Sequence, residues 1–379
     1  MDLDFSEEQE ILRGTVRALC DEYAPLDVVR SLEDDPVGYP SALWKQMAEL
    51  GLLGIQIPEV YGGAAQTALE SLVVYEELGR ALPPSPHFAS AVMSAGLLLA
   101  AGSEEQRQSW LPKIVSGEAI ITPAWLEPQG GFGPAGVQLA GAARKGEYRL
   151  SGTKRHVLFA SSAKRLLVLV RSGEAPDAID LVLVDPGAPG VRLKQQLSLA
   201  SDCQYEVTFD DVRVPVSERL GAAGSGWRFW EEVMHDGMIL YAAQAMGGAA
   251  RALEMTVAYA KERHQFGKPL AAFQAISHYL ADAVTSIDGG TTLAREAAWA
   301  RATGRPVDQL APMAKLFACQ TFRDVTAMAQ QVFGGVGFTV EFDIQLYFRR
   351  AKQLQVSWWD SRYLEERVAA AVLDRRGTA

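Results

Sequence analysis

The sequence predicts an α+β protein of several domains, in which a small β-rich region separates two helical regions. In the first and last parts, apolar residues recur every three to four positions, which is typical of amphipathic helices. In between, short β-branched runs alternate with glycine and proline, which is typical of strands and turns. We predict an N-terminal all-α domain over residues 1–117, a middle β domain over 118–220 and a C-terminal α-helical bundle over 221–379.

The N-terminal region begins with a clear helix signal. Ser6 and Gln9 form a capping box, in which each side chain satisfies a backbone N–H of the other residue. A second helix is expected to stop at Gly51, because glycine readily adopts the left-handed backbone conformation that often ends a helix. The helical stretches expected here are 44–50, 67–82 and 89–101.

In the middle region the spacing of apolar residues changes from about 3.6 residues, as in a helix, to 2 residues, as in a strand. We expect the segment 148–152 to be a strand running into a turn, followed by four further short strands. Because the strands are short and evenly spaced, they favour a small β-barrel or sandwich over a βαβ sheet. The other expected strands are 165–171, 179–184, 205–209 and 212–214.

The C-terminal region has the long helices of a bundle. The Ala- and Met-rich stretch 240–259 has little polar face, so we expect it to bury both sides, partly in a neighbouring subunit. No GxGxxG segment follows a strand, and the usual Rossmann route to a dinucleotide site is therefore absent. The expected helices are 227–261, 273–303, 306–333 and 360–375.

Composition excludes several classes of function. The formal net charge of −10 disfavours nucleic acid as a partner, because binding phosphates needs a basic face. The three cysteines and five histidines show no metal-ligand spacing, so no metal site is expected. The acidic start is unlike a signal peptide, and the apolar stretch 91–101 is too short to cross a bilayer. We expect a cytoplasmic protein with no membrane partner.

Several segments, in the same order and spacing, resemble those of the acyl-CoA dehydrogenase family. This resemblance covers essentially the whole chain. It implies that family's architecture: an N-terminal helical domain, a middle small β-barrel and a C-terminal helical bundle. The matching segments are LGLLG at 50–54, PEVYGG at 58–63, RHQFGKPL at 263–270, FQAI at 273–276, QVFGGVGF at 331–338 and YFRRAK at 347–352, with looser matches at Glu127-Pro128 and at LSGTK, 150–154.

The resemblance implies that FAD is the cofactor and that its diphosphate lies against a neighbouring subunit, in a homotetramer or heterotetramer. Bare glycine backbone can face an anion, and a guanidinium suits phosphate oxygens. The alternative is that the glycines make only a tight turn and that Arg263 caps a helix. The predicted cofactor-binding residues are Arg263, Gln265, Phe266, Gln274, Gln331, Gly334, Gly335, Gly337 and His156.

The family chemistry is α,β-desaturation of an acyl-CoA thioester in lipid metabolism. A carboxylate takes the α-proton, a hydride passes to the flavin, and an electron-transfer flavoprotein or similar acceptor reoxidises it. The base needs a pocket poor in water, because burial raises the pKa of a carboxyl group towards neutrality. An acyl-CoA substrate and a same or related dehydrogenase subunit are the implied partners.

The chain departs from the family at the expected base. Counted forward from Ala351, the position of the family's catalytic Glu is Trp358; counted backward from Arg367, it is Asp360. We predict that Asp360 is the catalytic base. The alternative is that Asp360 only caps the final helix. Some family members carry the base on the first long helix of the bundle, but the corresponding residue here is Gly237.

The flavin-facing residues of the β domain are also altered. His156 stands where the family has an aromatic residue, and Leu158 where it has a hydroxyl. These changes leave two alternatives open. One is a non-catalytic subunit that completes a partner's FAD site in an α2β2 assembly, and the other is a related flavin oxidase or monooxygenase.

Overall fold

The computed structural model describes residues 4–141 and 143–373. The chain folds into two compact units. The bundle unit takes its described residues from 1–29, 67–83 and 238–379, and the sheet unit comprises 30–66 and 84–237. Helix α7 (Gly226–Glu262) begins in the sheet unit and continues into the bundle unit.

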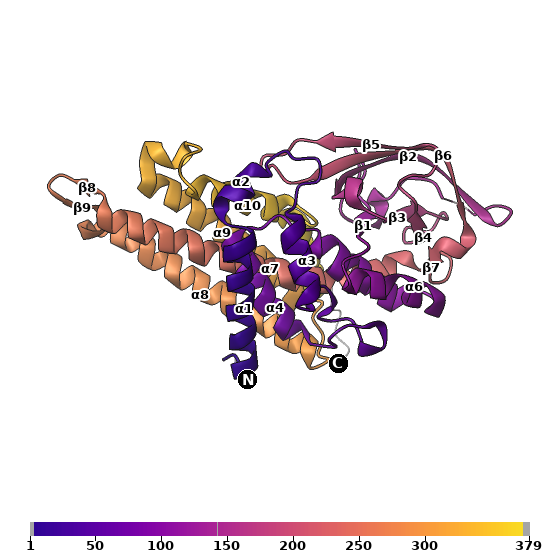
Figure 1. Ribbon diagram of the computed structural model, residues 1–379, viewed down its shortest axis with the longest axis horizontal. Helices are drawn as coiled ribbons and strands as arrows, with labels where there is room; N and C mark the ends of the chain where they lie inside the picture. The colour runs from indigo at the N-terminus through magenta and orange to yellow at the C-terminus, as the bar shows by residue number, and fades with distance from the viewer. Residues whose placement is uncertain (1–3, 142, 374–379) are drawn as a thin grey trace. The chain divides into compact units, whose positions relative to one another are not determined.

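The bundle unit is built from long helices packed side by side (Figure 1). Helix α1 packs on α4, α4 on α8, and α8, α10 and α11 on α9. Helices α4 and α7 approach closely through Gly79 and Gly247, where an added Cβ would lie 2.0 and 1.8 Å from a carbonyl oxygen of the facing helix. The helices are α1 (Glu7–Tyr23), α4 (Ala68–Ala81), α8 (Gln274–Ala302), α9 (Leu310–Phe333), α10 (Ile344–Val356) and α11 (Ser361–Leu373).

Two ion pairs and a hydrogen bond join α1, α7 and α10 to α4. Arg17 of α1 donates two hydrogen bonds to the buried carboxylate of Glu77, at 2.8 and 2.7 Å. Arg80 pairs with Glu254 of α7 at 2.8 Å, and the Arg80 carbonyl accepts a hydrogen bond from the Tyr347 hydroxyl of α10. The ion pairs are charge-assisted and partly buried, so they fix the register of α1 and α7 on α4, and the tyrosine hydrogen bond adds α10.

The sheet unit contains two sheets that enclose one apolar core. Figure 1 shows β2, β5 and β6 as one layer and β1, β3 and β4 as another. All neighbouring strands are antiparallel except β1 and β3, and Ala140 bridges Ser151 and Arg171 to link the two sheets. The strand orders are β1 (Ile121–Ala124), β3 (Arg165–Arg171), β4 (Ile179–Val184), β7 (Arg219–Leu220), and β2 (Glu147–Leu158), β6 (Gln204–Pro215), β5 (Val191–Gln196).

Helices complete the sheet unit. They are α3 (Ser41–Glu49), the π-helix η3 (Phe88–Ser94), α5 (Ala95–Ala101) and α6 (Glu104–Val115), while α2 (Leu26–Ser31) crosses from one unit to the other. Among the described residues, no helix is both long and apolar enough to cross a membrane, and no three His, Cys, Asp or Glu side chains converge as metal ligands would.

Much of the predicted secondary structure is confirmed. The capping box of Ser6 and Gln9 is formed, and Gly51 has the positive φ of 72° that ends a helix. The strands 165–171 and 179–184 have the predicted bounds. Helices α4, α7 and α8 agree with the prediction to within one residue at each end.

Two strand predictions were wrong, because β-bulges replace the expected breaks. The predicted turn after residue 152 is absent, since β2 continues to Leu158. The segments 205–209 and 212–214 belong to one strand, β6, in which Asp210 and Asp211 bulge opposite Ser151.

One helix prediction was wrong at its start, one ends at a residue outside the described part of the chain, and two helices were not predicted. Helix α9 begins at Leu310 rather than at residue 306, after a turn that includes Gly304 at φ 68°. Helix α11 ends, within the described residues, at Leu373, and residue 375 lies outside them. Helices α6 and α10 were not predicted, although Ile344, Tyr347 and Leu354 have helical spacing.

The buried His87 of the sheet unit makes stability depend on pH. Its Nε2 lies 3.0 Å from the Leu52 carbonyl oxygen, and burial lowers its pKa to about 4. Between pH 6.5 and 4 the unfolded chain therefore binds a proton that the folded chain does not, so stability falls as the pH falls. We expect a loss of about 2 kcal/mol at pH 5 relative to pH 8.

His87→Gln should remove this contribution, because an amide reaches the same carbonyl and does not titrate. We expect the midpoint of thermal unfolding to fall less from pH 8 to pH 5 in this variant than in the wild type. His278→Gln, on an exposed part of α8, is the control. An identical pH dependence in the wild type and in His87→Gln would contradict the assignment.

Candidate active site

A short hairpin carries three of the predicted cofactor-binding residues. It follows α7 and consists of β8 (His264–Gln265) and β9 (Lys268–Pro269). Its turn, Phe266-Gly267, has φ of 53° and 79°, the left-handed pair that a two-residue hairpin needs. Arg263 and Gln265 are exposed, and the Phe266 side chain is 92% exposed.

The base of this hairpin is held in place. The Arg263 N–H donates to the Tyr259 carbonyl at 2.8 Å, and the Leu270 N–H donates to the Arg263 carbonyl at 2.8 Å. The Phe273 ring lies 6.3 Å from that of Phe266 and 4.2 Å from the Lys268 ammonium. Gln274, the first residue of α8, is exposed. It directly follows Phe273, whose contacts with the hairpin hold this end of α8 in place.

The glycine turn follows α9 and forms the short helix η8 (Gly334–Phe338). Gly334 has φ 66° and ψ −142°, which only glycine adopts readily. A Cβ added at Gly334 or Gly335 would meet no atom within 4 Å, whereas one at Gly337 would lie 2.6 Å from the Gln330 side-chain oxygen. The first two glycines thus present open backbone, while Gly337 is needed for packing.

Aromatic stacking brings the hairpin and the glycine turn to the same end of the bundle unit. The rings of Tyr259 and Phe333 stack with centroids 4.2 Å apart, and the Phe342 ring packs against both. Tyr259 lies one turn before Arg263, and Phe333 directly precedes Gly334. An exposed arginine and an open glycine backbone therefore lie at the same end of the bundle unit, which suits the diphosphate of a dinucleotide. Gln331 is exposed in the last turn of α9.

His156 lies in the sheet unit, in a bulge of β2. Its φ is 55°, its side chain is exposed, and its Nδ1 lies 2.5 Å from the Gln204 side-chain oxygen. Its backbone N–H donates to the side chain of Gln196 at 3.0 Å. Two side-chain amides therefore fix the conformation of the bulge that presents the imidazole.

The two looser motif matches of the sheet unit meet in a buried ion pair. The Lys154 ammonium donates to the Glu127 carboxylate at 2.7 Å and to the Trp125 carbonyl at 3.1 Å. Glu127 also accepts the backbone N–H groups of Gln138 and Leu139. Burial lowers the pKa of Lys154 to about 8, against the opposing effect of Glu127. This pair fixes the 125–139 loop beside β2.

Asp360 lies in the connection between α10 and α11. It is half-buried, and its carboxylate accepts the Tyr363 N–H at 2.9 Å, so it is the N-cap of α11. The two preceding indole side chains, of Trp358 and Trp359, are buried with ring centroids 5.9 Å apart. Asp360 therefore caps α11, and the two side chains that precede it in the chain are apolar and buried.

Asp360 and the glycine turn are at opposite ends of α10. That helix has 13 residues, which corresponds to a length of about 20 Å. The glycine turn therefore lies about the length of this helix from the Asp360 connection of the same chain.

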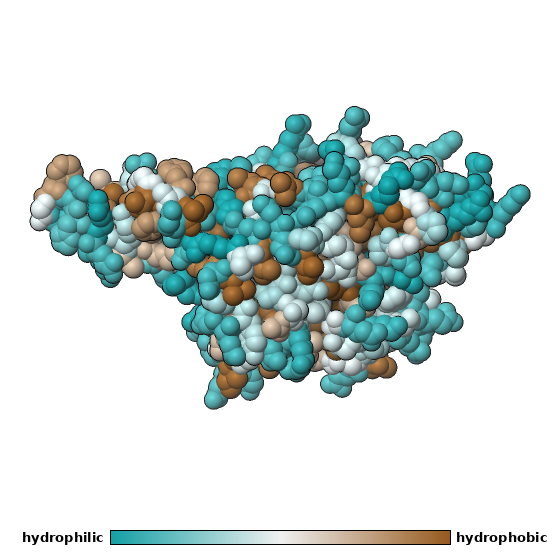
Figure 2. Space-filling model, turned by 45° about the horizontal axis from the view of Figure 1, so that its top comes forward, coloured by the Kyte–Doolittle hydropathy of each residue, from teal (hydrophilic) through white to brown (hydrophobic). Residues whose placement is uncertain are grey.

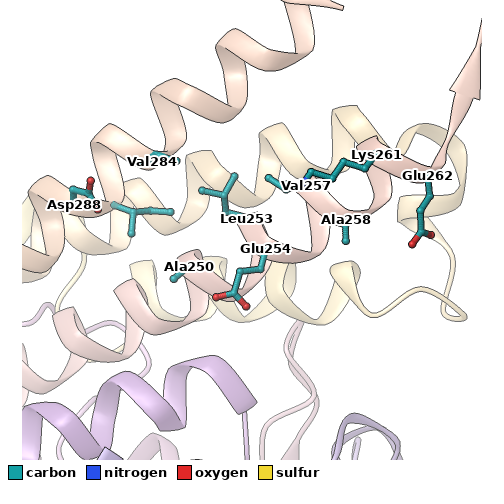
Figure 3. Close-up of a pocket in the computed structure, with 10 residues that line it drawn as sticks. Ala250, Leu253, Glu254, Val257, Ala258, Lys261, Glu262, Val284 and Asp288 are labelled. Atoms are coloured by element: carbon teal, nitrogen blue, oxygen red, sulfur yellow. The ribbon is translucent and has the colours of Figure 1, made fainter. Parts of the chain in front are cut away.

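An apolar groove of about 620 Å³ runs along α7 and α8 in the bundle unit. Figure 3 shows the lining residues Leu253 and Val257 of α7 and Val284 of α8, with Lys261 and Glu262 at the end that leads to the hairpin. Figure 2 shows hydrophobic residues scattered among polar ones on the face of the molecule that it presents.

The sequence matches three domain families, the acyl-CoA dehydrogenase N-terminal domain over residues 6–118, the middle domain over 123–212 and the C-terminal domain over 224–372. A probable acyl-CoA dehydrogenase of Bacillus subtilis (strain 168) is 31% identical over 366 residues, which cover 94% of this chain and 95% of the relative. The chain belongs to the acyl-CoA dehydrogenase family.

Solved structures of acyl-CoA dehydrogenase type have the same fold. Butyryl-CoA dehydrogenase from Megasphaera elsdenii superposes with a TM-score of 0.91 and 27% identity, covering 98% of this chain and all of that one. A chain of the ChsE4–ChsE5 complex from Mycobacterium tuberculosis gives a TM-score of 0.89 and 26% identity, with both chains fully covered.

Sequence reasoning missed Lys315, a fully buried lysine of α9 next to the Asp360 connection. Its neighbours Ala311, Ala314, Ala318 and Phe322 are all buried at helical spacing. Lys315 lies on the same apolar face, and that position could have identified it from the sequence.

Proposed function

We propose that this chain catalyses the FAD-dependent α,β-desaturation of an acyl-CoA thioester. Members of its family are oxidoreductases that act on CH–CH bonds. The observation that carries the proposal for this chain is the Tyr259–Phe333 stack, with ring centroids 4.2 Å apart, because it sets an exposed arginine beside an open glycine backbone.

The hairpin and the glycine turn would hold the FAD diphosphate. Arg263 supplies charge and paired N–H donors, and the backbone at Gly334 and Gly335 lets a phosphate approach because no side chain obstructs it. When bound, FAD accepts a hydride from the β-carbon of the substrate. The remaining proposed contacts are Gln265, Phe266, Gln274, Gln331 and Gly337, with His156 of the sheet unit.

The proposed FAD site is shared between subunits. The length of α10 separates Asp360 from the glycine turn by about 20 Å. This separation favours an arrangement in which the carboxylate and the diphosphate clamp that serve one flavin come from two chains. The apolar groove along α7 and α8 offers surface that such an assembly would bury, and we propose a tetramer.

Asp360 is the proposed base. In this role its carboxylate accepts the α-proton of the thioester, while Trp358 and Trp359 exclude water from the connection. The Tyr363 N–H, which the carboxylate now accepts, would hold it in one orientation. Electrons then leave through an electron-transfer flavoprotein or a similar acceptor.

The second candidate is a subunit that completes the FAD site of a related partner chain without performing the chemistry itself. Two observations favour it: Trp358 stands at one counted position of the family's base, and the carboxylate of Asp360 is engaged as a helix cap. The ChsE4–ChsE5 structure, a complex of two differently named proteins, has this fold in one of its chains.

One experiment separates the two candidates. The purified chain, alone and together with a related dehydrogenase chain, is incubated with a series of acyl-CoA thioesters and an electron acceptor. We expect the corresponding enoyl-CoA by mass spectrometry, formed by the chain alone. Product only with the partner chain would support the second candidate, and hydroxylated product or hydrogen peroxide would indicate a related flavin oxidase or monooxygenase.

A further inference from the structure

Lys315 of α9 holds a buried positive charge that no motif of the sequence explains. Its side chain has no exposed surface. Its ammonium donates to three backbone carbonyls, those of Leu354 at 3.3 Å, Ser357 at 3.3 Å and Trp359 at 2.6 Å. An ammonium group has three N–H donors, so these carbonyls use all of them.

The three carbonyls belong to one short stretch of chain. Leu354 lies in the last turn of α10, where carbonyls lack partners within the helix and a cation is favourable. Ser357 and Trp359 lie in the connection that follows. The ammonium group therefore ties the end of α10 to the connection, and burial lowers its pKa as the charge is removed from water.

The connection contains a residue in an unfavourable conformation. Trp358 is buried and has φ 66°, in the left-handed region that bulky residues rarely adopt. Such a conformation persists only where the surroundings fix it. Lys315 binds the carbonyl on each side of Trp358, which is the contact needed to hold this residue in place.

We propose that Lys315 is a positioning residue that sets the place of Asp360 relative to the substrate. The Trp359 carbonyl is part of the peptide unit that ends in the Asp360 N–H, so the 2.6 Å bond fixes that peptide plane directly. The opposite charges of Lys315 and Asp360 also attract one another. This inference rests on the proposed function, in which Asp360 is the base.

Lys315→Met in the FAD-loaded protein tests the proposal, because methionine fills a similar volume without charge or N–H donors. We expect hydrogen exchange of the backbone amides at 357–360 to become roughly tenfold faster. We also expect flavin bleaching by saturating acyl-CoA to slow roughly 100-fold, since a displacement of about 1 Å can cost this much. The acyl-CoA concentration for half-maximal rate should change little.

Cys319→Ala is the matched control. Cys319 lies one turn from Lys315 on α9, and its sulfur lies 3.6 Å from the same Leu354 carbonyl oxygen. Its removal leaves the ammonium in place, so both measurements should match the wild type. If Lys315→Met does not fold, Lys315→Gln, which keeps an amide donor, is measured instead, and a smaller change in the same direction is expected.

Unchanged exchange at 357–360, or unchanged bleaching despite faster exchange, would overturn the positioning role. Failure of the proposed function appears elsewhere, in an Asp360→Asn variant that bleaches at the wild-type rate. The exchange measurement does not depend on catalysis, and the two failures can therefore be distinguished.

Discussion

Asp360→Asn is expected to slow flavin bleaching by acyl-CoA roughly 10²- to 10⁴-fold, the range typical for loss of a general base. Asparagine is as good an N-cap as aspartate, so the bond from the Tyr363 N–H should survive. Stability, FAD content and assembly should therefore be those of the wild type. Rapid mixing with acyl-CoA in the absence of oxygen measures the rate.

Asp360→Glu is the matched variant, in which we expect the rate to be largely retained and the stability to fall. Glutamate keeps the carboxylate and restores the length of the family's usual base, but it caps helices poorly. We expect a bleaching rate within about tenfold of the wild type and a loss of about 1 kcal/mol of stability. A purely structural Asp360 would leave the bleaching rate of the Asn variant at the wild-type value, while the effects on stability would be the same.

The second large effect is expected at the diphosphate clamp. Arg263→Ala removes a guanidinium that would make paired, charge-assisted hydrogen bonds to phosphate, and we expect FAD affinity to fall roughly 100-fold. Gly335→Val is expected to expel FAD as well. A Cβ at this position meets no atom of the chain within 4 Å, so the variant should fold normally and obstruct only the ligand.

Flavin content after gel filtration and circular dichroism together check this prediction. Arg305→Ala is the control, because Arg305 is an exposed arginine just beyond the far end of the 29-residue helix α8. Wild-type flavin content in both Arg263→Ala and Gly335→Val would show that the clamp is assigned to the wrong residues.

The fold could be predicted from the sequence largely because its periodicity is clear. The strands 165–171 and 179–184 are continuous apolar runs, and their bounds were predicted correctly. The bulge at Asp210 and Asp211 could not be foreseen, because two adjacent aspartates read locally as a turn. Only pairing with β2 across the sheet shows that the strand continues.

The candidate site was harder to predict, because its parts meet through contacts between segments far apart in the chain. Sequence motifs identified Arg263 and Gly335 separately, but Tyr259, the residue on which Phe333 of the glycine segment stacks, lies in no motif. For Asp360, the sequence left base and cap as alternatives. The structure shows the cap, and the catalytic role remains a prediction.

The most direct test of the proposed function is the absorption spectrum of the purified protein during titration with acyl-CoA in the absence of oxygen. We predict the two visible bands of oxidised flavin in the starting protein, and their loss on addition of an acyl-CoA whose chain fits the site. A protein without flavin bands, or flavin that no acyl-CoA bleaches with or without a partner chain, would contradict the dehydrogenase function.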